Sequence, residues 1–79
     1  MTITKIWFDR EFLYVAVDSG HVIGNPIAWF PRLAKASLEQ RQQYELGPFK
    51  DSIHWEAIDE DLSLESLFDF RRELDYAKI

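Results

Sequence analysis

The sequence predicts a small α+β domain with a three-stranded antiparallel meander and a short fourth strand, packed with two or three helices. Three observations predict this class. Segments rich in β-forming residues alternate with polar turns over residues 3–23, a capping-box pattern begins a helix at Ser37, and apolar residues recur at helical spacing after residue 61. Because 79 residues can bury one modest core, we expect a single domain over residues 1–68, with residues 69–79 as its C-terminal helical extension.

The meander is expected to occupy residues 3–23. Alternation along a first strand, residues 3–8, places Ile3 with Trp7 on one face and the other apolar residues on the opposite face. Residues 12–17 are apolar on both faces, which is typical of a central strand. Asp18-Ser19-Gly20 predicts a turn, and residues 21–23 return as a third strand that ends at Gly24-Asn25-Pro26.

Two helical segments are expected in the middle of the chain. Pro31 disfavours helical geometry at the residue before it and opens a short helical turn that reaches Ala36. Ser37 and Gln40 match a capping box, so a second helix begins there and runs through Tyr44, ahead of Gly47-Pro48.

The last third of the chain predicts a strand and a helix. Residues 52–55 form the short fourth strand, with Ile53 and Trp55 inward and His54 outward. Residues 62–68 predict a helix with an apolar stripe that includes Leu64 and Leu67. The same spacing continues through residues 69–79.

Charge is distributed unevenly along the chain. Residues 1–53 carry six acidic and six basic residues, whereas residues 54–79 carry eight acidic and three basic residues and hold the whole net charge of −5. An acidic chain repels phosphate backbones, so nucleic acid is disfavoured as a direct partner and a basic protein surface is favoured. The chain has no cysteine, which excludes disulfides and thiolate sites, and no apolar run long enough for a membrane helix, so we expect a cytoplasmic protein.

Four acidic residues gather before the predicted last helix: Glu56, Asp59, Glu60 and Asp61. Such a cluster can bind a divalent cation or supply paired carboxylates for acid–base chemistry. The favoured interpretation is helix-start chemistry, in which the acids face the positive end of the helix dipole and Asp61 or Ser63 is the N-cap. We therefore expect no metal site and no cofactor.

Three further residue sets suggest alternative functions. His54 can meet Asp59 or Asp61 across the strand-to-helix turn, which suggests a small enzyme or a metal-binding protein. The bases Arg32, Lys35 and Arg41 suggest weak nucleic-acid binding, although three charges fall short of the roughly 6–10 phosphate contacts of a strong binder. Aromatic residues suggest a stacking platform for bases, but core packing is the favoured interpretation for Trp7, Phe8, Trp29, Phe30 and Trp55.

The order of these segments resembles a known family. The segment Trp29-Phe30-Pro31-Arg32-Leu33 precedes the Ser37 helix start, and Ile53-His54-Trp55 is followed by Asp59-Glu60-Asp61-Leu62-Ser63. This order resembles the small bacterial family named domain of unknown function 2442, over roughly residues 3–68, beyond which the chain adds about eleven residues to the usual pattern. The resemblance implies a small α+β module, often encoded beside a second small protein as in toxin–antitoxin pairs, and it supplies no catalytic residues.

These observations predict a non-enzymatic interaction module, antitoxin-like or regulatory, that docks a protein with a basic surface. Complementary charge steers such an encounter, and a few apolar anchors supply most of the affinity. A homodimer through the C-terminal helix is a second expected contact. The expected partner-binding residues are Trp55, Glu56, Asp59, Glu60, Asp61, Phe68, Phe70, Leu74 and Tyr76.

Overall fold

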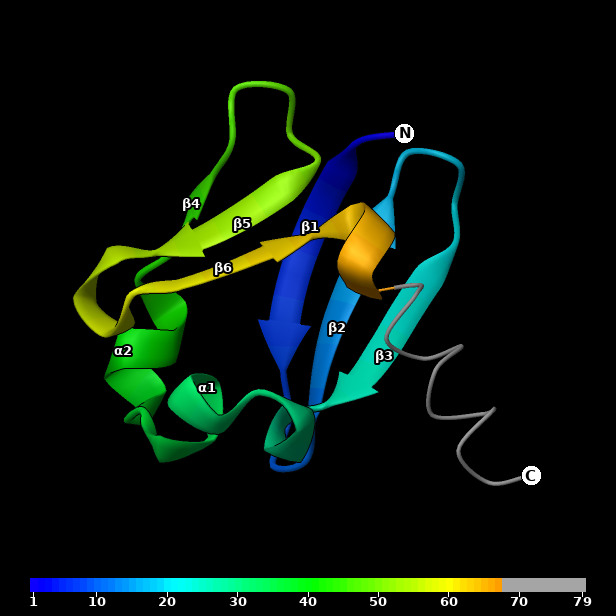
Figure 1. Cartoon of the computed structure of the whole chain (residues 1–79). Helices are drawn as coiled ribbons and strands as arrows, with labels where there is room; N and C mark the ends of the chain where they lie inside the picture. The colour runs from blue at the N-terminus through cyan, green and yellow to red at the C-terminus, as the bar shows by residue number, and fades with distance from the viewer. Residues whose placement is uncertain (68–79) are drawn as a thin grey trace.

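The computed structural model describes residues 1–67 and contains two three-stranded antiparallel sheets with short helices between them (Figure 1). The first sheet has the order β1-β2-β3 and the second the order β4-β5-β6. The α+β class is confirmed. The strands are β1 Ile3–Phe8, β2 Phe12–Val17, β3 Val22–Pro26, β4 Glu45–Leu46, β5 Ser52–Trp55 and β6 Glu60–Ser63.

The β1–β2 turn is organised by one carboxylate. The Asp9 carboxylate accepts hydrogen bonds from the backbone amides of Glu11 and Phe12, at 2.8 and 2.7 Å, and from the hydroxyl of Tyr14 at 2.8 Å. The Tyr14 hydroxyl, with the two amides, lowers the pKa of Asp9, because all three bonds favour the ionised form. This turn therefore fixes the Tyr14 side chain on the outer face of the first sheet.

A register shift between Ile3 and Lys5 interrupts the pairing of β1 with β2. The extra residue reverses the alternation, so Ile3 lies on the core face together with Ile6 and Phe8. Trp7 lies on the outer face, where its ring stacks on Tyr14 at a centroid distance of 5.4 Å. The prediction that Ile3 and Trp7 share a face is wrong for this reason.

The third strand is longer than expected. It begins at Val22 and includes Gly24 and Asn25 as far as Pro26. Proline is accepted there because β3 is an edge strand, where a missing amide removes no bond to β2.

Four short helical segments occupy the connections: η1 Ile27–Trp29, α1 Pro31–Lys35, α2 Leu38–Gln42 and η2 Glu56–Ile58. The predicted capping box at Ser37 is confirmed, with both reciprocal bonds to Gln40 present at 3.0 and 3.1 Å. The helix ends at Gln42 and not at Tyr44, because the chain turns to pair Glu45–Leu46 with β5.

The second sheet is the main departure from the prediction, which had only one short strand in this region. Residues 60–63 form β6, and helical geometry begins at residue 64. Asp59 adopts the left-handed conformation (φ 52°), which turns the chain back so that Leu62 pairs with Ile53 and faces the core. Asp61 is therefore a strand residue and no N-cap, whereas the Ser63 hydroxyl accepts the Ser66 amide at 3.0 Å and fills that role.

The core lies between the two sheets. One buried cluster joins Leu13, Val15, Val17 and Ile23 of the first sheet to Ile53, Trp55 and Leu62 of the second, with Leu33 and Leu67 from the helical segments. Asn25 is the polar exception: its side chain is 1% exposed, and neither of its amide atoms has a hydrogen-bond partner in the described part of the chain. Within residues 1–67, no helix is long and apolar enough to cross a membrane.

Candidate interaction surface on the second sheet

The outward face of the second sheet carries a row of ionisable residues. Glu45, His54 and Asp61 are cross-strand neighbours on β4, β5 and β6, because the register pairs Glu45 with His54 and His54 with Asp61. Ile53 and Trp55 flank His54 in the chain and point inward, so the opposite face of the sheet is committed to the core. We call Glu45, His54, Glu56 and Asp61 the acidic face.

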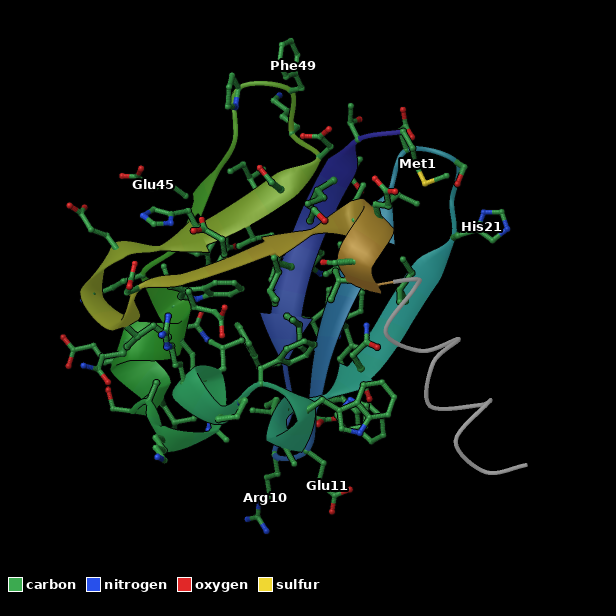
Figure 2. The ribbon with its side chains drawn as sticks, in the orientation of Figure 1. Met1, Arg10, Glu11, His21, Glu45 and Phe49 are labelled. Atoms are coloured by element: carbon green, nitrogen blue, oxygen red, sulfur yellow. The ribbon has the colours of Figure 1, made fainter. Side chains whose placement is uncertain are left out.

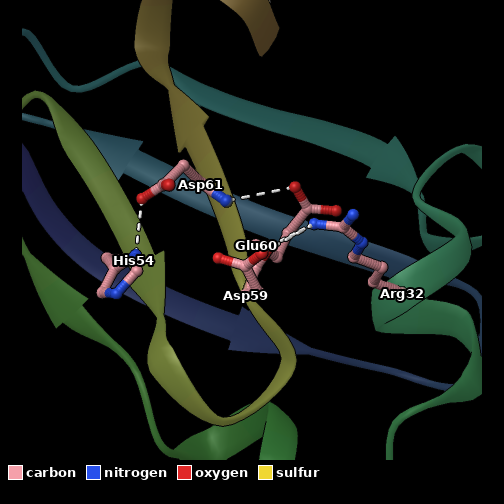
Figure 3. A network of polar contacts seen from close by, with 5 residues as sticks. All are labelled: Arg32, His54, Asp59, Glu60 and Asp61. Atoms are coloured by element: carbon pink, nitrogen blue, oxygen red, sulfur yellow. Dashed lines mark hydrogen bonds and ion pairs between the residues drawn. The ribbon is translucent and has the colours of Figure 1, made fainter.

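His54 is held by a single carboxylate. Its Nδ1 atom lies 2.6 Å from Oδ1 of Asp61 (Figure 3), and the two side chains are 42% and 74% exposed. The hydrogen bond to Asp61, with smaller contributions from the charges of Asp61, Glu56 and Glu45, raises the pKa of His54. The pairing confirms that His54 meets Asp61 and shows that it does not meet Asp59.

A cavity of about 400 Å³ opens beside His54. It is lined by Gln43, Tyr44, Glu45, His54, Glu56 and Ala57, so two carboxylates and an aromatic ring share one concave surface. The Tyr44 ring also contacts Trp55, at a centroid distance of 6.2 Å, which ties the cavity wall to the core.

Three of the four clustered acids of the sequence, Asp59, Glu60 and Asp61, point in different directions (Figure 3). Asp59 turns toward α1, where its carboxylate is 3.6 Å from Nη1 of Arg32 and its carbonyl accepts a hydrogen bond from the same atom. Glu60 accepts the backbone amide of Asp61 at 3.1 Å. Among the residues that the structure describes, no three histidine or acidic side chains gather closely enough to hold a metal ion.

Trp55, one of the expected partner-binding residues, lies in the core. Its side chain is 0% exposed, because strand alternation points it into the core, and its indole N–H donates to the carbonyl of Arg41 at 3.0 Å. Four further expected partner-binding residues lie outside the described residues: Phe68, Phe70, Leu74 and Tyr76.

The basic residues of the nucleic-acid alternative do not form a free cationic surface. Arg41 donates to the carbonyls of Leu33 and Ala34 at 2.9 and 3.1 Å, which covers the end of α1, and Arg32 is engaged by Asp59. Lys35 is the remaining member of the set. Two of the three side chains thus have hydrogen-bond partners within the described part of the protein.

The sequence analysis missed two apolar features at the surface, one half-buried and one exposed. Phe12, Tyr14 and Trp7 form a stack on the outer face of the first sheet, and Lys5 lies over the Trp7 ring at 5.2 Å. The signal was present in residues 12–17, which are apolar on both faces. Phe49, 78% exposed, points away from the molecule at the tip of the loop between β4 and β5 (Figure 2).

Comparison with known proteins gives one match. The chain matches the family described as protein of unknown function, DUF2442, over residues 3–73. The match reaches beyond the residues 3–68 of the expected resemblance and leaves residues 1–2 and 74–79 outside it. Searches of curated proteins and of solved structures gave no match. Since the match covers most of the chain, this protein belongs to the DUF2442 family.

Proposed function

We propose that this protein is a non-enzymatic interaction module that docks a protein with a basic surface. The supporting observation is the acidic face, where Glu45 and Asp61 are exposed on the second sheet and Glu56 is exposed directly after β5, while Ile53 and Trp55 on the other side of β5 are buried in the core. Its antitoxin-like or regulatory role in a two-protein pair, in the bacterial cytoplasm, is the part of the proposal that rests on the family resemblance.

The residues that line the cavity favour a cationic group on the partner. Carboxylates bind ammonium and guanidinium groups, and aromatic rings attract the same cations through their faces. Glu45 and Glu56 supply the carboxylates and Tyr44 the ring. The partner therefore inserts an arginine or lysine side chain, while the surrounding negative charge accelerates the encounter.

Co-purification with the protein encoded by the adjacent gene, followed by calorimetry of the purified pair, tests this function. Glu45→Gln with Glu56→Gln removes two charges from the cavity and is expected to weaken binding by about tenfold or more. Glu11→Gln with Glu39→Gln removes the same charge from exposed positions elsewhere and is the matched control. Failure of the pair to associate at micromolar concentration, or equal losses in both double variants, contradicts the proposal.

The short His54–Asp61 contact supports a second candidate, a small enzyme or metal-binding protein. A carboxylate on Nδ1 fixes the orientation of the imidazole and leaves Nε2 for proton transfer or for a metal. His54→Gln then removes an activity or a metal affinity without changing the far-UV circular dichroism spectrum. A variant that matches the parent protein in every such assay dismisses this candidate.

A further inference from the structure

The outer edge of β3 carries backbone groups that no described residue satisfies. Pairing with β2 uses the backbone of Ile23 and Asn25, as the flanking bonds from Val17 to His21 and from Ile27 to Glu11 establish. Alternation then directs the amides and carbonyls of Val22 and Gly24 away from the sheet. In Figure 1, β3 is the border strand of the first sheet.

Two of the other sheet edges in residues 1–67, β6 and β1, are better protected. On β6, the amide of Asp61 is bonded to the Glu60 carboxylate and that of Ser63 to the Ser66 hydroxyl. On β1, the Ile3 amide donates to the carbonyl of Lys50 at 2.7 Å, and the charged Lys5 lies within the strand. Residues 22–26 contain no charged residue, and Val22 is 54% exposed. Charged residues and covering segments protect an edge, so β3 is more open than β1 and β6.

We propose that β3 pairs with β3 of a second copy of this chain, antiparallel about a two-fold axis at Ile23. This register places Val22 opposite Gly24 of the second copy, and each such pair exchanges two N–H···O=C bonds. The ladder ends at Pro26, which has no amide to donate. Because residues 22–26 are uncharged, no like-charged side chains of these residues meet across the two-fold axis.

Side chains on the outer face fit the same register. Gly24 has no side chain, and the ring of Tyr14 covers it: a Cβ at Gly24 would lie 3.1 Å from a Tyr14 ring carbon. Val22 of the second copy arrives beside this ring and buries its exposed methyl groups there. A standard interface buries about 1,200–2,000 Å², and two short strands bury less. The dimer is therefore weak, and its population depends on protein concentration.

Sedimentation velocity of the full chain from about 10 μM to about 1 mM tests the dimer. A monomer–dimer equilibrium is expected in this range. Val22→Lys places a charge on the two-fold edge and raises the dimer Kd at least about tenfold, whereas Leu38→Lys adds the same charge to another exposed apolar residue and leaves the Kd unchanged. A chain that stays monomeric at about 1 mM, or two variants with equal effects, overturns the proposal.

Hydrogen exchange of the unmodified chain provides a test that needs no variant. The Val22 and Gly24 amides are expected to become protected as concentration rises, while the Ile23 amide, bonded to β2, is protected throughout. Protection of Val22 and Gly24 in the monomer would mean that another segment of the chain covers the edge, and would overturn the dimer. Either result is independent of the acidic face.

Discussion

His54 shows how one neighbour sets the charge of an exposed residue. Asp61 lies directly across the strand pair, so its bond to the imidazole is a consequence of register. The bond favours the protonated ring and raises the pKa of His54 above its ordinary value of 6.5. The stabilisation that this bond gives the folded state is therefore complete below pH 6.5, and it is lost as the pH rises through the folded-state pKa of His54.

Asp61→Asn is expected to lower the pKa of His54, because the variant removes both the charged acceptor and the nearest negative charge. An NMR titration of the His54 ring protons measures the change directly. Asp51→Asn removes one charge from an exposed position beyond this row and is the control. A His54 titration that is identical in the Asp61→Asn variant and the parent protein would show that the contact is not formed in solution.

Asn25 gives a second prediction for a single residue. A buried amide without hydrogen-bond partners costs about 1–3 kcal/mol, so Asn25→Leu, which has nearly the same shape, is expected to raise the free energy of unfolding by an amount in that range. Urea denaturation measures it. Gln42→Leu makes a similar change at an exposed helical position and is expected to shift stability by no more than about 0.5 kcal/mol. Destabilisation by Asn25→Leu would indicate a polar partner for this amide.

Within the first sheet, Gly24 and Tyr14 act as a cross-strand pair. The ring of Tyr14 lies on Gly24, stacks on Trp7 and Phe12, and is anchored through its hydroxyl by Asp9. Because the ring is restrained on several sides, it cannot withdraw from an added methyl group. A glycine that weakens an isolated strand is here required by the aromatic residue above it.

Gly24→Ala is accordingly expected to destabilise the protein by about 1–3 kcal/mol, the usual cost of overpacking. Thermal unfolding measures this cost. Combining it with Tyr14→Phe, which releases the ring from Asp9, is expected to reduce the penalty of the alanine. If Gly24→Ala leaves the stability unchanged in the protein that retains Tyr14, the ring can move farther than its contacts indicate.

Elements were predictable where the signal is local. The Asp18-Ser19-Gly20 turn and the Ser37 capping box depend on residues close in sequence, and both were correct. The strands β4 and β6 were missed because Glu45–Leu46 and Glu60–Ser63 are short and polar and become strands only by pairing with β5. The same cause hid the candidate site: the Glu45–His54–Asp61 row exists only once that register is set.

At the scale of the whole molecule, the two sheets have different exposed chemistry. The second sheet presents the acidic face, and the first sheet presents aromatic rings and the uncharged edge of β3. Trp55 links them, since it belongs to the second sheet, fills the common core and donates to the backbone of Arg41. The single-domain organisation over residues 1–68 stays a prediction.

The strands β3 and β4 lie on opposite sides of the molecule (Figure 1). Their separation determines how many binding sites a dimer would present. An assembly joined along β3 would hold two copies of the cavity that we propose binds a cation, at a fixed spacing and each still open to solvent. A ligand carrying two basic segments would then be captured by avidity, with the second attachment occurring at high effective concentration. A weak self-association would in this way convert two modest contacts into one tight complex.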